Sequence, residues 1–148
     1  MGNGSMPTAY GRILVPFDGS DGASKALRRA VYLAEALGAE VTAFSVDEHV
    51  PRYAPAVGEI QEEKGLRDAE FAELRRRVGA VAKELGREIK METRVGHAAQ
   101  SIVAYAQEQN FDVIVMGQSG HSGVWGTLLG STTARVVDHA PCDVLVVR

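Results

Sequence analysis

The sequence predicts an open α/β fold, with a single five-stranded parallel sheet covered by helices on both faces. Five short segments have the composition of strands, and four amphipathic segments alternate with them along the chain. A strand–helix alternation produces a parallel sheet, because each right-handed crossover packs a helix back onto the sheet. We predict the strand order 3-2-1-4-5, which leaves the third and the last strand at the two edges.

The strands are predicted from short runs of apolar residues. Four of the five runs are nearly continuous, which is typical of parallel strands buried on both faces. The third run alternates instead, so we predict an edge strand whose inner side is formed by Ile89, Met91, Thr93 and Val95. The predicted strands are residues 12–17, 40–46, 88–95, 112–117 and 143–148.

Apolar stripes at helical spacing fill the segments between the strands. In the first, a stripe that runs from Leu27 to Leu37 is expected to face the sheet. Gly38 follows it as a C-terminal cap, and Gly86 ends the second helix in the same way. The predicted helices are residues 24–38, 59–86, 98–110 and 131–140.

Length and charge limit the classes of function. A chain of 148 residues is the size of one domain, and we assign that domain to residues 12–148. Residues 1–11 are small and polar, and we expect a disordered segment or a remnant of cloning. The formal net charge of -3 argues against a general partner among nucleic acids or acidic membranes, both of which attract basic proteins.

The single cysteine and the absence of a long apolar run in the sequence bear on whether the protein lies in the cytoplasm, outside the cell or in a membrane. Cys142 has no second cysteine with which to form an intramolecular disulfide, and no segment of the sequence has membrane-spanning length and apolarity. We therefore expect a cytoplasmic protein. Cys142 has no basic neighbours in the sequence that would activate a thiolate, so we expect it to serve packing.

A glycine-rich stretch, GQSGHSGVWGTLLGST, joins the fourth strand to the last helix at residues 117–132. In open α/β sheets ligands bind at the carboxyl ends of strands, where this stretch begins. Gly117 and Gly120 allow a sharp turn and close approach of the backbone to a ligand. The stretch ends at a helix N-terminus, whose free N–H groups attract anions. Composition alone leaves open a flexible connection with Ser131 as the N-cap.

The spacing of the glycines in this stretch resembles the signature of a known protein family. GxxG, nine residues and Gly-Ser, from Gly117 to Ser131, resemble the ATP-binding signature of the universal stress protein family. ILVPFDGSDGA and GSTTARVVDHAPCDVLVV resemble the family's opening and closing segments, so the resemblance covers residues 12–148. It implies a Rossmann-like fold of the adenine nucleotide alpha hydrolase type and a homodimer formed through the last strand, residues 143–148. The apolar composition of that edge strand agrees, because such an edge is usually covered.

The resemblance also implies the contacts of a bound ATP. Backbone and hydroxyl groups of the glycine stretch would hold the phosphates, and Asp18 would face the nucleoside. The backbone of Val46 would contact adenine and Pro16 would wall the base pocket, while Mg²⁺ would be carried by the phosphates rather than by a protein metal site. Asp18 has an alternative role, which is to organise the turn before the first helix. The implied residues are Pro16, Asp18, Val46, Met116, Gly117, Gln118, Ser119, Gly120, His121, Gly130, Ser131 and Thr132.

The sequence favours binding of ATP over its chemistry. A Walker lysine motif and the SGGxDS loop of ATP pyrophosphatases are both absent from the sequence. We therefore expect a nucleotide-dependent regulator of a stress response with an unidentified downstream partner. A slow ATPase or phosphotransferase that uses the same pocket, and a nucleotide-independent dimeric interaction module, remain as alternatives. Substitution of Gly130 by valine is expected to weaken ATP binding and leave the fold intact.

Overall fold

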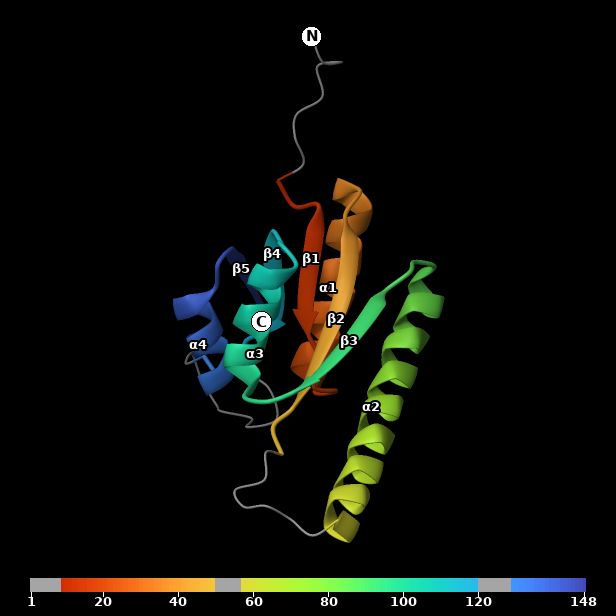
Figure 1. The fold of residues 1–148 in the computed structure, drawn as a ribbon. Helices are drawn as coiled ribbons and strands as arrows, with labels where there is room; N and C mark the ends of the chain where they lie inside the picture. Colours follow the sequence, from red (N-terminus) through yellow and green to blue (C-terminus); the bar gives the residue numbers. More distant parts are fainter. Residues whose placement is uncertain (1–8, 50–56, 120–128) are drawn as a thin grey trace.

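The computed structural model describes residues 9–49, 57–119 and 129–148. Five parallel strands form one sheet in the order β3-β2-β1-β4-β5, so the predicted fold class and strand order are confirmed (Figure 1). The elements in chain order are β1 Arg12–Pro16, α1 Asp21–Leu37, β2 Glu40–Asp47, α2 Val57–Leu85, β3 Lys90–Val95, α3 Ala98–Glu108, β4 Val113–Gly117, α4 Ser131–His139 and β5 Asp143–Val147.

Helices cover both faces of the sheet. On one face α1 and α2 pack over a core that contains Val15 and Val115 from the strands and Leu27 and Val78 from the helices. On the other face α3 and α4 enclose a smaller core around Phe44 (Figure 1). Neighbouring residues of β1 and of β4 alternate between the two cores, which is why these strands read as continuous apolar runs.

Local signals explain where α1 begins and ends. The Ser20 side chain accepts a hydrogen bond from the Ala23 backbone N–H, so Ser20 is the N-cap and the helix begins three residues before the predicted residue 24. Gly38 ends the helix in the left-handed conformation, with φ of 67°. Glycine adopts this left-handed conformation with little strain, because it has no Cβ. The predicted C-terminal cap at Gly38 is therefore confirmed.

Two predictions of burial are wrong. The Leu37 side chain is 38% exposed, because it is the last residue of α1 and lies at the margin of the stripe that faces the sheet. Val95 is 42% exposed, because it ends the edge strand β3. Met91 and Thr93 of the same strand are half-buried, so the alternation holds until the strand ends.

None of the helices in the described part of the chain combines the length and apolarity needed to cross a membrane. The longest, α2, has 29 residues, but charged side chains cover much of it. Only Val78 and Val81 of α2 are buried, and the half of the helix that precedes them is mostly exposed.

Candidate functional site

The parallel sheet brings the carboxyl ends of β1, β2 and β4 to one edge, where the predicted site residues lie. The turn after β1 is built around Asp18. The Ser20 backbone N–H donates to Asp18 Oδ1 at 2.9 Å, and Gly19 between them has φ of 81°, which favours glycine. The turn-organising role that the sequence left open for Asp18 is therefore present, while its carboxylate is exposed at the edge of the sheet.

The end of β4 touches the start of α1, backbone against backbone. A Cβ added to Gly117 would lie 2.9 Å from the carbonyl carbon and oxygen of Gly22. A Cβ added to Gly22 would lie 2.7 Å from the carbonyl oxygen of Ser119. Only glycine at both positions permits this approach, which places Gly117 and Ser119 beside the first turn of α1.

The two ends of the glycine-rich stretch meet at the start of α4. The Gly130 backbone N–H donates to the Gln118 carbonyl at 2.9 Å, and the Thr133 hydroxyl donates to the Gly117 carbonyl at 3.0 Å. Gly130 occupies the N-cap position of α4, and no side-chain hydrogen bond from that residue caps the helix. The alternative of Ser131 as N-cap is therefore wrong. An N-terminus without a side-chain cap leaves its backbone N–H groups available to an anion.

Most of the predicted contact residues of the glycine-rich stretch fall into this one place. Gln118, Ser119 and Thr132 are half-buried and Ser131 is exposed, so these side chains reach the surface beside the helix N-terminus. Gly120 and His121 lie outside the described residues. The set that the structure brings together comprises Gly117, Gln118, Ser119, Gly130, Ser131 and Thr132.

The remaining predicted residues lie on the strands. Met116 is 5% exposed and its side chain belongs to the core around Phe44, so only its backbone can serve a site. Val46 lies one residue before the end of β2, half-buried, with its side chain packed against the same core. Pro16 ends β1 in register with Phe44.

A cavity of about 650 Å³ lies between α1 and the start of the glycine-rich stretch. Gln118 and Ser119 line it, together with two cations that the sequence analysis did not assign to the site, Lys25 and Arg148. Lys25 Nζ donates to the Arg148 carbonyl at 2.8 Å. The signal that could have found Lys25 is its place near the start of the first helix, close in space to the carboxyl ends of the strands.

A buried carboxylate sits at the end of β2, next to Val46. Asp47 accepts hydrogen bonds from the His49 backbone N–H at 3.0 Å, from His49 Nδ1 at 2.6 Å and from Arg67 Nε at 2.9 Å. Burial by itself raises the pKa of Asp47, but these hydrogen bonds outweigh it and lower the pKa below its ordinary value. The hydrogen bond and charge of Asp47 raise the pKa of His49, and the charges of Glu70 and Glu63 add to this.

The comparisons with known proteins decide the family. The family model described as the universal stress protein family matches residues 9–148. The chain belongs to the universal stress protein family. The family resemblance read from the sequence is therefore confirmed.

Individual universal stress proteins resemble the chain over nearly its whole length. One from Methanocaldococcus jannaschii is 37% identical over 140 residues, covering 94% of this chain and 82% of the relative. The structure of the universal stress protein UspA from Lactobacillus plantarum has a TM-score of 0.80 and 38% identity, covering 94% of this chain and 98% of that one. A universal stress protein in complex with cAMP has a TM-score of 0.73 and 28% identity, covering 95% and 98%.

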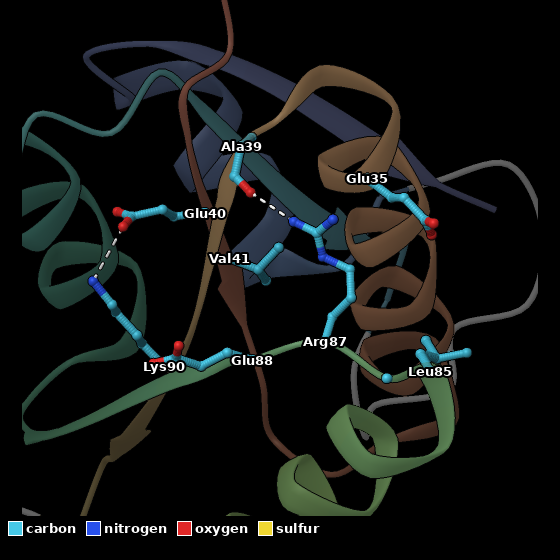
Figure 2. Close-up of a pocket in the computed structure, with 9 residues that line it drawn as sticks. Glu35, Ala39, Glu40, Val41, Leu85, Arg87, Glu88 and Lys90 are labelled. Carbon is cyan, nitrogen blue, oxygen red and sulfur yellow. Dashed lines mark hydrogen bonds and ion pairs between the residues drawn. The ribbon is translucent and has the colours of Figure 1, made fainter.

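A second cavity, of about 440 Å³, lies at the other end of this universal stress protein (Figure 2). It is lined by Glu35 of α1, by the residues around the start of β2 and by those that join α2 to β3. Its charged side chains are partly engaged, because Arg87 Nη2 donates to the Ala39 carbonyl at 3.1 Å and Lys90 pairs with Glu40 at 3.4 Å. Of the predicted contact residues that the structure describes, none lines this cavity.

Proposed function

We propose that this universal stress protein binds ATP and acts as a nucleotide-dependent regulator in a stress response. The observation that carries the proposal is the N-terminus of α4, which has no side-chain cap from Gly130 and lies beside Gly117. A helix N-terminus offers backbone N–H groups and a partial positive charge, both of which stabilise phosphate.

The nucleotide is placed along the edge formed by the carboxyl ends of the strands. The phosphates lie over the first turn of α4, where the backbone N–H groups of the helix N-terminus and the hydroxyls of Ser131 and Thr132 can donate to them. We place adenine against the backbone of Val46 at the end of β2. Mg²⁺ comes with the phosphates. In this arrangement Pro16 walls the base, Asp18 faces the nucleoside, and Gly120 and His121 belong to the phosphate loop.

A relative supports an adenine nucleotide as the ligand. The universal stress protein in complex with cAMP is 28% identical to this chain and has the same fold. That ligand shares adenine, ribose and phosphate with ATP, which supports an adenine nucleotide as the ligand that we propose for this chain. The number of phosphates that this chain prefers is decided by titration of ATP, ADP, AMP and cAMP.

We propose that ATP acts here as a regulatory ligand and is not hydrolysed rapidly. A ligand shifts a conformation or an assembly only if it binds one state better than another. The assembly that we propose is a homodimer through residues 143–148, which contain the edge strand β5, where Leu145 is 41% exposed. A cytoplasmic location and an unidentified downstream partner complete the proposal.

The substitution that tests the site is Ser131→Asp, in the first turn of α4. Ser131 is exposed, so the fold is expected to tolerate the change. A negative charge at a helix N-terminus stabilises the helix by about 0.3–1 kcal/mol, yet it repels phosphate at the same place. Stability should therefore rise or stay constant while ATP affinity falls at least about tenfold, which corresponds to ~1.4 kcal/mol. Ser131→Asn, which adds no charge, is the matched control.

Gly130→Val, which the sequence suggested, is a poorer test. A Cβ on Gly130 would lie 3.2 Å from Ser119 Cα and 3.4 Å from Ser119 Cβ, so the substitution presses on the loop itself. A loss of binding in that variant would mix the effect of the added side chain with a displaced backbone. The charge substitution at Ser131 avoids this because its side chain is exposed.

The measurement is calorimetric titration of ATP with Mg²⁺ into nucleotide-stripped protein, with circular dichroism to confirm folding. Saturable binding that Ser131→Asp weakens and Ser131→Asn preserves supports the proposal. A folded, stripped wild-type protein without affinity for ATP refutes it and favours a nucleotide-independent interaction module. Release of phosphate on the timescale of catalytic turnover, lost in Ser131→Asp, would instead assign a slow ATPase.

A further inference from the structure

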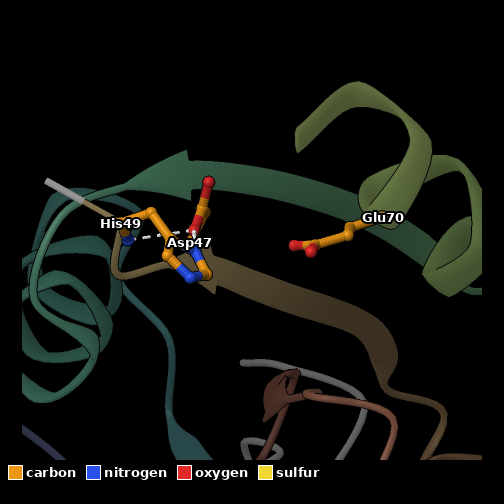
Figure 3. A group of neighbouring side chains, drawn as sticks. All are labelled: Asp47, His49 and Glu70. Atoms are coloured by element: carbon orange, nitrogen blue, oxygen red, sulfur yellow. Dashed lines mark hydrogen bonds and ion pairs between the residues drawn. The ribbon is translucent and has the colours of Figure 1, made fainter. Parts of the chain in front are cut away.

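Three side chains with metal-binding atoms converge where β2 ends. Asp47 and His49 come from the end of β2 and the residues after it, and Glu70 extends towards them from α2 (Figure 3). One ligand atom from each of the three lies within 4.8 Å of the others. Among the residues that the structure describes, this is the single group of three or more histidine, cysteine or acidic side chains with that property.

The central carboxylate is held in place before any ion arrives. The side chain of Asp47 is 5% exposed, and Arg67 Nε holds its Oδ2 at 2.9 Å while Oδ1 faces His49. The Asp47 carbonyl accepts from the Gly96 backbone N–H at 2.9 Å, which ties the end of β2 to the end of β3. In protein metal sites, residues behind the ligands make hydrogen bonds of this kind, and these bonds fix the orientation of the ligand side chain.

The other two side chains can adjust their positions. His49 is 83% exposed at its side chain, and Glu70 is exposed on the surface of α2. Ligand atoms that bind one ion at about 2.1 Å lie at most about 4.2 Å apart. His49 Nδ1 already lies 2.6 Å from Asp47 Oδ1, so closing the group needs only a rotation of the exposed Glu70 side chain.

The charge balance around the group favours a cation. Asp47 and Glu70 contribute two carboxylates, and the charge of Glu63 also acts on His49. Arg67 is the cation paired with Asp47, and it occupies the carboxylate oxygen that faces away from His49. A divalent ion bound to Oδ1 would therefore meet an imidazole nitrogen and two carboxylate oxygens.

We propose that Asp47, His49 and Glu70 form a binding site for a divalent cation of the zinc class. One imidazole and two carboxylates suit borderline ions such as Zn²⁺ and Co²⁺, and a set of three protein ligands leaves a coordination position for water. The ion replaces the hydrogen bond between His49 Nδ1 and Asp47 Oδ1 and joins the end of β2 to α2. This site does not depend on ATP binding and is separate from the Mg²⁺ carried by the phosphates.

The test uses the full chain, stripped of nucleotide and of metal, and Zn²⁺ alone as the probe. Calorimetric titration should show one Zn²⁺ per chain, and Co²⁺ should give a visible absorption band that Zn²⁺ abolishes. His49→Ala and Glu70→Gln should each weaken Zn²⁺ binding at least about tenfold, the least that loss of even an outer-shell partner costs. Both side chains are exposed, so these variants should fold.

Two substitutions elsewhere serve as matched controls. His139→Ala removes an exposed histidine on α4, and Asp68→Asn removes an exposed carboxylate on α2 outside the group. Both controls should bind Zn²⁺ like the wild type, and Zn²⁺ should raise the Tm of the wild type more than that of His49→Ala at the same concentration. The proposal is overturned by the absence of saturable binding, by equal affinity in all variants, or by loss of binding in a control. Any of these would leave the group as a hydrogen-bonded anchor between β2 and α2.

Discussion

Two glycines within helices should respond to alanine in opposite directions. Gly22 lies in the first turn of α1, and Gly79 lies within α2. A Cβ on Gly22 would lie 2.7 Å from the Ser119 carbonyl oxygen and 4.0 Å from Gly117 Cα. Outside the backbone of its own helical turn, a Cβ on Gly79 would meet no atom of the described residues within 4 Å. The pair therefore separates helix propensity from the steric demand of the site.

The expected free energies follow from these distances. Alanine stabilises a helix interior by about 0.8–1 kcal/mol relative to glycine, so Gly79→Ala should raise the free energy of unfolding by roughly that amount. At Gly22 the methyl group must displace the Ser119 backbone, and overpacking of this kind costs about 1–3 kcal/mol. The gain in helix propensity from alanine is smaller in a first turn than in a helix interior. Gly22→Ala should therefore lower the free energy of unfolding by about 1–2 kcal/mol, and each kcal/mol lowers Tm by about 3 °C.

The assay is urea unfolding followed by circular dichroism for the wild type and both variants, with thermal unfolding as a second measure. Because Ser119 belongs to the proposed phosphate loop, calorimetry should also show weaker ATP binding for Gly22→Ala and unchanged binding for Gly79→Ala. If Gly22→Ala stabilises the protein as much as Gly79→Ala does, the close contact between α1 and the end of β4 does not constrain position 22. That result would refute a backbone contact between Gly22 and Ser119 that excludes a side chain.

Three further predictions concern the core, the cysteine and the edge of the sheet. Phe44 is 2% exposed and stacks on Tyr105 at 4.4 Å between ring centroids. Phe44→Ala should cost about 3–5 kcal/mol in urea unfolding, against less than ~0.5 for Tyr32→Ala at an exposed ring, and similar losses would contradict the burial. Burial, then the charges of Asp143 and Asp112, raise the pKa of the Cys142 thiol. Alkylation by iodoacetamide should therefore reach half of its maximal rate at a higher pH in the folded protein than in urea, and coincident profiles would refute this. Leu145→Glu should convert the proposed dimer to a monomer in sedimentation velocity, whereas Leu66→Glu on α2 should not; a Leu145→Glu dimer would exclude this edge.

The order of the elements could be predicted from the sequence because it depends on local patterns. Apolar runs, stripes and the glycines at positions 38 and 86 placed every strand and helix in the right order, with ends within about three residues. The edge position of β3 followed from its alternation. The failures, Leu37 and Val95, lie at the ends of elements, where periodicity no longer reports what covers a side chain.

The glycine-rich stretch could also be recognised from the sequence, because all of its motif residues lie within one short segment, residues 117–131. The family match over residues 9–148 confirms the family that this spacing indicated. The close approach of Gly22 to Gly117 was beyond sequence reasoning, because about a hundred residues separate them and nothing in either local pattern names the other.

The sequence by itself determined the fold class and the edge of the sheet at which to search, because hydrophobic periodicity and crossover handedness act locally along the chain. Tertiary structure alone decided which side chains meet there. It placed Lys25 beside Gln118 and Ser119, and it aligned Glu70 on α2 with Asp47 at the end of β2. Such contacts depend on how far a helix extends past the strand it covers and on the direction of each side chain, and both are settled only when the elements pack.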